Sequence, residues 1–168
     1  MLVGGLAAGV QGEPRATLDA DLVTFLPPDE LERLIACARR RKIRISPAAV
    51  RRGVTADAFF RLKVAGVQVD FIVGQSAFEF DILTRRKFVT LYGTRVPVAT
   101  PEDVMLMKLV SGRPQDWQDA KAVLVRHGTR LDRSYLEGWA RELRVQRGRG
   151  RVIRRLARLR AMRYREAP

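Results

Sequence analysis

The first 23 residues, MLVGGLAAGVQGEPRATLDADLV, contain the pattern that decides the fold. Residues 1–3 are apolar and predict a short strand, after which Gly4 and Gly5 open a short helix over residues 6–10. Residues 13–17 are typical of a turn-rich loop. Residues 18–25, LDADLVTF, then alternate acidic and apolar side chains with a period of two. The stretch therefore predicts a strand, a glycine turn into a helix, a loop and a second strand.

Two carboxylates stand out on the second of these strands. Residues two apart on a strand point to the same face, so Asp19 and Asp21 project together, roughly 7 Å apart. Without a cation such a pair repels, and the pKa of at least one carboxyl would rise. A divalent cation resolves the conflict, and Mg²⁺ commonly joins one or two carboxylates to nucleotide phosphates. The alternative is that both aspartates are exposed residues of an edge strand.

A third carboxylate would complete a two-metal site. The best candidate is Asp70, which lies in the middle of the apolar segment VQVDFIV at residues 67–73, where an unpaired charge is costly. Glu79 and Asp81 are weaker candidates because their segment is less regular.

The glycine turn predicts a phosphate site beside these acids. Where a strand ends and a helix starts at Gly4 and Gly5, backbone N–H groups and the helix dipole favour an anion. The segment matches neither the P-loop pattern nor the G-x-G-x-x-G fingerprint. A phosphate cradle next to carboxylates suits a nucleoside triphosphate.

These motifs resemble the signature of the DNA polymerase β-type nucleotidyltransferase superfamily, in which Gly-Gly or Gly-Ser precedes Asp-x-Asp on the next strand. The longer run is similar to the minimal nucleotidyltransferases of the AbiEii toxin kind, which carry Arg-x-Thr before the aspartates, as Arg15 and Thr17 do here. Residues 96–124 also resemble the C-terminal segment of that family, with a lysine on one helix and an arginine and two aspartates entering the next. The resemblance spans roughly residues 1–127.

The resemblance implies a role for each motif. The three acids, Asp19, Asp21 and Asp70, would bind two Mg²⁺, and Asp70 would also act as the base nearest the attacking hydroxyl. The implied nucleotide-binding residues are Gly4, Gly5, Arg15, Thr17 and Lys108. The implied reaction is attack of an acceptor hydroxyl on the α-phosphorus of a nucleoside triphosphate, with loss of pyrophosphate.

The order of elements predicts an α+β protein with a mixed β-sheet and a C-terminal helical portion. Further strands are expected at residues 42–45, 59–64, 67–73, 87–93 and 94–99, with a glycine turn joining the second and third of these. Helices are expected at residues 26–42, 100–112, 116–127, 132–144 and 151–165. We expect a catalytic core at 1–100, a helical portion at 101–144 and a basic helix or tail at 145–168.

The charge distribution points to a polyanionic partner. The 168-residue chain has a net charge of +14, and residues 144–168 hold ten arginines against one glutamate. Such a segment favours nucleic acid first and an anionic membrane second, although a merely solvated basic tail has the same composition. The single cysteine, Cys37, excludes an intramolecular disulfide and fits a cytoplasmic location. No stretch is long and apolar enough to span a membrane.

Several other charged residues allow two interpretations. Lys108 lies among apolar neighbours on its helix, so it either extends its amine to water or contacts a phosphate. One interpretation of the segment at 113–119 is structural: Asp116 is a helix N-cap and an Arg113–aspartate pair holds the turn. The other is that Arg113, Asp116 and Asp119 take part in the cleft. His127 lies at the end of a helix, and this position favours a contact with the helix dipole over a catalytic role.

Three functions follow as hypotheses. The first is a metal-dependent nucleotidyltransferase that modifies RNA, in particular tRNA, as the toxin of a toxin–antitoxin or phage-defence pair with a cognate antitoxin protein. The second is nucleotidyl transfer to a small molecule such as an aminoglycoside, or to a protein; a basic protein disfavours a cationic drug. The third is a non-catalytic nucleic-acid-binding module that keeps the fold.

Overall fold

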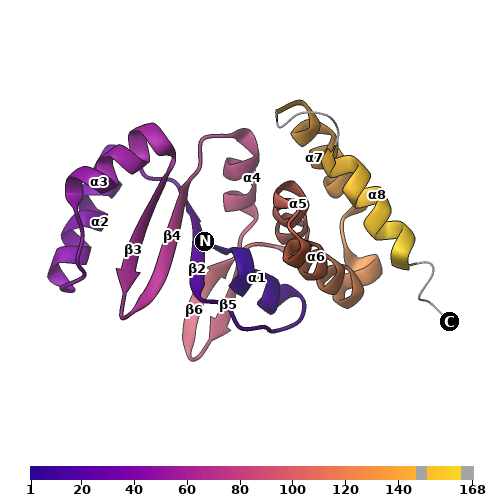
Figure 1. Ribbon diagram of the computed structural model, residues 1–168, viewed down its shortest axis with the longest axis horizontal. Helices are drawn as coiled ribbons and strands as arrows, with labels where there is room; N and C mark the ends of the chain where they lie inside the picture. Colours follow the sequence, from indigo (N-terminus) through magenta and orange to yellow (C-terminus); the bar gives the residue numbers. More distant parts are fainter. Residues whose placement is uncertain (147–150, 164–168) are drawn as a thin grey trace. The chain divides into compact units, whose positions relative to one another are not determined.

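The computed structural model describes residues 1–146 and 151–163 (Figure 1). The chain divides into two compact units. Residues 1–6 and 16–98 form the first, here called the sheet unit. Residues 7–15 and 99–168 form the second, here called the helical unit, in which residues 147–150 and 164–168 lie outside the described residues. Part of the predicted basic helix or tail at 145–168 is therefore undescribed. Within the described ranges no helix is both long enough and apolar enough to cross a membrane.

The sheet unit is built on one mixed sheet of six strands in the order β3-β4-β2-β1-β6-β5. Strand β2 runs parallel to β4, whereas β1 pairs antiparallel with β2 and parallel with β6. The strands are β1 Leu2–Val3, β2 Asp19–Thr24, β3 Phe59–Val64, β4 Val67–Val73, β5 Lys87–Leu91 and β6 Thr94–Val98. Together with the C-terminal helices, this sheet confirms the predicted α+β class.

One face of the sheet packs against two helices, α2 (Pro28–Arg40) and α3 (Pro47–Arg52). Alternate residues of β3 are buried, and their partners are apolar side chains of both helices and of β4. The core cluster comprises Leu31, Ile35, Val50, Phe60, Leu62 and Val73. A π-helical turn, η1 (Gly53–Asp57), then leads into β3. The exposed alternate side chains of β3 therefore lie on the face of the sheet opposite to α2 and α3.

The turn between β3 and β4 sets the register of this hairpin. Ala65 and Gly66 both have positive φ, 48° and 86°, as a two-residue hairpin turn requires. The register that follows pairs Val64 with Val67 and, three steps along, Arg61 with Asp70. The predicted hairpin is therefore confirmed.

The helical unit contains α5 (Pro101–Ser111), α6 (Pro114–His127), η2 (Gly128–Arg130), α7 (Arg133–Gln146) and α8 (Arg151–Arg163). Helix α5 begins and ends as its sequence predicts: the Thr100 hydroxyl accepts a bond from the Asp103 amide, and Gly112 has the left-handed φ of 67°. In α8 a stripe of Val152, Leu156 and Leu159 is buried, which confirms the amphipathic helix. Helix α1 (Gly4–Gln11) begins in the sheet unit and ends in the helical unit.

Three local expectations are wrong. Residues 42–45 form no strand, because Lys42 takes a positive φ of 57° and the Ile43 amide still donates to Ala38 at the end of α2. Helix α4 (Ala77–Arg85) occupies a segment for which no helix was expected, and a Ser76–Glu79 capping box starts it. Asp116 is not the N-cap of α6; Arg113 holds that position.

Candidate carboxylate site

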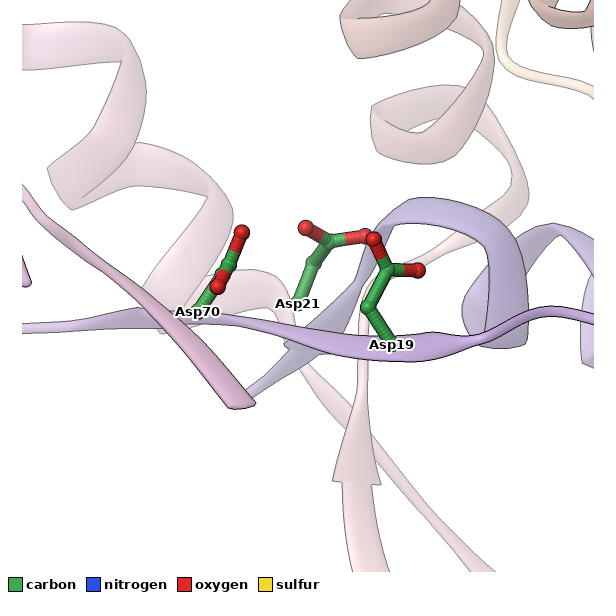
Figure 2. Close-up of side chains that lie close together, drawn as sticks. All are labelled: Asp19, Asp21 and Asp70. Carbon is green, nitrogen blue, oxygen red and sulfur yellow. The ribbon is translucent and has the colours of Figure 1, made fainter. Parts of the chain in front are cut away.

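The three predicted acids converge on one face of the sheet (Figure 2). Asp19 and Asp21 lie two residues apart on β2, and Asp70 is the register partner of Asp21 on the adjacent parallel strand β4. Directly paired residues point to the same face, so the pairing brings the third carboxylate to the other two. One oxygen from each residue lies within 4.8 Å of the others. We call these three residues the carboxylate trio.

The trio gathers three carboxylates at one point of the sheet. Asp70 is buried, whereas Asp19 and Asp21 are half-buried. The Thr17 hydroxyl donates to Asp19 Oδ1 at 2.8 Å, so this predicted nucleotide-binding residue orients one of the acids. Three neighbouring carboxylates repel one another strongly in a partly desolvated position. A cation at this point would relieve that repulsion.

Arg61, a residue that sequence reasoning missed, supplies part of the positive charge. From β3 it forms a two-pronged ion pair with Asp70, with Nε to Oδ1 at 2.6 Å and Nη2 to Oδ2 at 2.8 Å. Hydrogen bonding to Asp70 raises the pKa of the Arg61 guanidinium, and the charges of the other two acids add to the effect. The signal was present in the sequence, because the two-residue turn at residues 65–66 places Arg61 opposite Asp70.

The donor set of the trio fits a hard divalent cation. Carboxylate oxygens are the ligands that Mg²⁺ and Mn²⁺ prefer, and a chain with three of them converging can hold such an ion while waters or substrate complete its shell. Within residues 1–146 and 151–163 no other group of three acidic, histidine or cysteine side chains gathers in this way. The weaker candidate Glu79 instead caps α4 through Ser76.

Gly4 lies directly against the trio. It has a φ of +63°, and a Cβ atom at this position would overlap the carboxylate of Asp21. The strand β1 that precedes it pairs with β2, with Val3 opposite Asp21. Glycine is thus needed here for two reasons, the left-handed backbone and the close approach of the acid. As predicted, Gly4 and Gly5 end a strand and start a helix; their contact with phosphate stays a prediction.

The remaining predicted nucleotide-binding residues, Arg15 and Lys108, lie in the helical unit and belong to a second charge cluster. Lys108 is buried, and its Nζ lies 3.0 Å from Asp116 Oδ1 and 2.7 Å from Asp119 Oδ2. Arg15 Nε donates to Asp119 Oδ1 at 2.8 Å, and Arg113 Nε to Asp116 Oδ2 at 2.8 Å. We call these five residues the buried cluster. Its contacts agree with the interpretation of an arginine–aspartate pair at the start of α6.

Burial and hydrogen bonding oppose each other in the buried cluster. Burial raises the pKa of the Asp116 carboxyl, but hydrogen bonds from Arg113, Ser111 and Lys108 outweigh it, so the net shift is well below the usual range. At Asp119, burial likewise raises the pKa, and bonds from Arg15, Lys108 and Gln115 lower it further than burial raises it. Both acids are therefore held ionised. His127 Nε2 lies 2.8 Å from the backbone oxygen of Gln11.

Comparison with protein-family models and with curated proteins finds no match for the chain. Among solved structures, a candidate nucleotidyltransferase from Thermotoga maritima is 19% identical with a TM-score of 0.47, over 70% of this chain and 76% of that one. An antigenic nucleotidyltransferase-like protein from Paracoccidioides brasiliensis is 16% identical with a TM-score of 0.37, over 73% of this chain and 64% of that one. Neither similarity is close enough to bear on activity, which has to be inferred from the chain's own side chains.

Proposed function

We propose that this protein is a metal-dependent nucleotidyltransferase that moves a nucleoside monophosphate from a nucleoside triphosphate to an acceptor hydroxyl. The observation that carries the proposal is the convergence of three carboxylates within 4.8 Å on neighbouring parallel strands, next to a glycine turn into a helix. Bound Mg²⁺ would polarise the phosphoryl oxygens and stabilise the charge that develops on them. The protein would contribute positioning and charge neutralisation.

Each acid has a distinct proposed role. Asp19 and Asp21 would hold the cations, and the Thr17 hydroxyl keeps Asp19 in its orientation. Asp70 would complete the ligand set and accept the proton of the attacking hydroxyl. The acceptor oxygen forms a bond to the α-phosphorus, the bond from that phosphorus to the bridging oxygen breaks, and pyrophosphate leaves with the electron pair.

The proposed triphosphate ligands are the backbone at Gly4 and Gly5 and the cations Arg15 and Lys108. Gly4 supports this assignment because it lies against Asp21, where a phosphate chain would meet the trio. Arg15 and Lys108 already bond to Asp119, so their role in nucleotide binding has to be tested against a role in stability.

The proposed acceptor is RNA, in particular tRNA, in a toxin–antitoxin or phage-defence setting. The net charge of +14 supports a phosphate-rich acceptor over a cationic aminoglycoside. On α8 three arginines are exposed: Arg151, Arg154 and Arg158. Successive members are three and four residues apart, a spacing that places neighbouring side chains on one side of a helix. Arg155 is used internally, since it donates to the backbone oxygens of Leu109 and Val110 at the end of α5.

The test is a transfer assay with each of the four α-labelled nucleoside triphosphates and Mg²⁺, offered tRNA, a protein mixture and an aminoglycoside in parallel. Label on tRNA supports the proposal, whereas label only on the drug or protein assigns another acceptor. The variant Asp21→Asn should be inactive, and Asp29→Asn, which removes the same charge from an exposed position on α2, should retain activity. Tight RNA binding without transfer to any acceptor would indicate the non-catalytic module.

A further inference from the structure

A pocket runs along the free edge of the sheet, at strand β3. Its volume is about 280 Å³, and its walls come from residues 44–46 before α3, from α3 and η1, and from β3 itself. Because β3 is the last strand of the sheet on this side, no strand within residues 1–146 or 151–163 pairs with its outer edge. The whole pocket lies within the sheet unit.

The charge of the pocket wall is strongly positive. Four cationic side chains line it against the single acid Asp57; they are Arg44, Arg52, Arg61 and Lys63. In the part of the chain that the structure describes, Arg44, Arg52 and Lys63 are exposed and have no ion-pair partner. Nearby arginines do find partners, as Arg51 does with Glu32 at 2.8 Å. Unpaired cations gathered around one concave surface favour an anionic ligand.

The pocket adjoins the carboxylate trio through Arg61. Arg61 lines the pocket and also bonds to Asp70, and Lys63 is the register partner of Gln68, two residues before Asp70. Arg61 and Lys63 therefore lie on the same face of the sheet as the trio. Phe59, the next residue on that face, is 38% exposed, and the Arg61 Cζ lies 5.6 Å from its ring centre.

We propose that this pocket, here called the β3 pocket, is a second binding site that takes a phosphate group of a nucleotide or nucleic acid beside the carboxylate trio. Arginine is suited to two-pronged phosphate contacts, and an exposed aromatic face next to cations is typical of sites that bind single-stranded nucleic acid. The assignment of that phosphate to the acceptor strand rests on the proposed function, but the binding of the phosphate itself does not.

The test is an NMR titration of the ¹⁵N-labelled full-length protein without divalent metal, observing backbone amides and arginine side-chain signals. The probes are inorganic phosphate, a nucleoside triphosphate and a 5′-phosphorylated RNA dinucleotide. Saturable shifts should cluster at Ser46, Gly53 and Leu62, which lie in the pocket wall. Tighter binding of the dinucleotide assigns the phosphate to a strand, and tighter binding of the triphosphate assigns it to a free nucleotide.

A double variant supplies the decisive comparison. Arg44→Gln with Arg52→Gln should weaken binding at these signals about tenfold or more, because two charge-assisted contacts are lost. The matched control is Arg39→Gln with Arg40→Gln, which removes the same charge from exposed positions at the end of α2 and should change binding by less than about twofold. Shifts spread over the basic surface, or equal weakening by both double variants, would overturn the proposal.

The outcome is separable from that of the proposed function. The variant Asp21→Asn should lose nucleotidyl transfer but keep the β3 pocket shifts. If the wild type shows the pocket shifts and no transfer, the proposed function fails and the phosphate site stands. If transfer occurs without the pocket shifts, the phosphate site fails alone.

Discussion

The carboxylate trio and the buried cluster differ in how exposed their charged side chains are and in how many cations bond to their acids. In the trio, three carboxylates lie within 4.8 Å of one another, and the arginine that pairs with one of them, Asp70, has a side chain that is 53% exposed. In the buried cluster, two aspartates receive bonds from three cations, and Lys108, Asp116 and Asp119 have side chains only 2–6% exposed.

The difference indicates that one cluster stabilises the fold and that the other is suited to binding an ion. Removing ions from water is costly, so a closed cluster persists only when its members pair and hydrogen-bond fully, and it then holds the surrounding fold in place. A partly exposed cluster of like charges adds little to stability and is suited to binding an ion of the opposite sign. We therefore expect substitutions in the trio to affect activity with little loss of stability. Substitutions in the buried cluster should lower stability, and those of Arg15 and Lys108, the proposed triphosphate ligands, should also weaken nucleotide binding.

The largest expected effect is at Asp21. The variant Asp21→Asn should lower the rate of nucleotidyl transfer about a thousandfold or more, because a lost metal ligand removes several kcal/mol of transition-state stabilisation. Its free energy of unfolding should change by less than about 1 kcal/mol, because asparagine keeps the shape of the side chain and lowers the repulsion among the three acids. Transfer kinetics and urea unfolding measure the two quantities. Full activity together with a large loss of stability would reverse the comparison.

The next effect is at Lys108. The variant Lys108→Met should lower the free energy of unfolding by about 3–5 kcal/mol, because it leaves two buried aspartates without their shared cation. The exposed Lys87→Met is a control and should change stability by less than about 0.5 kcal/mol. Unfolding in guanidinium chloride gives both values. A raised KM for the triphosphate would support the proposed role of Lys108 in nucleotide binding, and an unchanged stability would remove its structural role.

The buried cluster should also make the protein sensitive to acid. Its two aspartates have lowered pKa values in the folded state, so the unfolded chain binds more protons once the pH falls below about 4. Their contribution to stability is thus fully present above that range and is lost as the pH falls, by up to about 1.4 kcal/mol per pH unit for each carboxyl. Unfolding measured from pH 6 to 2 should show a shallower slope for Asp116→Asn than for the wild type. Identical slopes would remove the cluster from the acid response.

The smallest expected effect is at Arg61. The variant Arg61→Gln should bind Mn²⁺ several-fold more tightly, because Asp70 loses the cation that now competes for its oxygens. Isothermal titration calorimetry measures the affinity without any need for catalysis. Arg95→Gln, a charge-matched change on β6, should leave the affinity unaltered. Weaker Mn²⁺ binding by Arg61→Gln would show that the arginine positions Asp70 for the metal.

The site could be predicted from the sequence where local rules apply. Alternation of side chains put Asp19 and Asp21 on one face, and the glycine turn after Val3 was recognisable from composition. The helix α4 was missed because its capping box lies in a segment rich in β-forming residues, and residues 42–45 were taken for a strand although the end of α2 holds Ile43. In both places a hydrogen bond of one side chain or one amide outweighs the average propensity.

The sequence alone determined most of the elements, with the exceptions of α4 and residues 42–45, and the chemistry of the acids, because both depend on neighbours a few residues apart. Only the tertiary structure decided which distant groups meet. The parallel register of β2 with β4 brings Asp70 to Asp21, and the β3–β4 register brings Arg61 to Asp70. The packing of α5 against α6 brings Lys108 to its two aspartates. Such pairings are fixed by the burial of apolar faces over the whole sheet and over the packed helices. That burial depends on residues far apart in the sequence, so a local sequence pattern does not predict it.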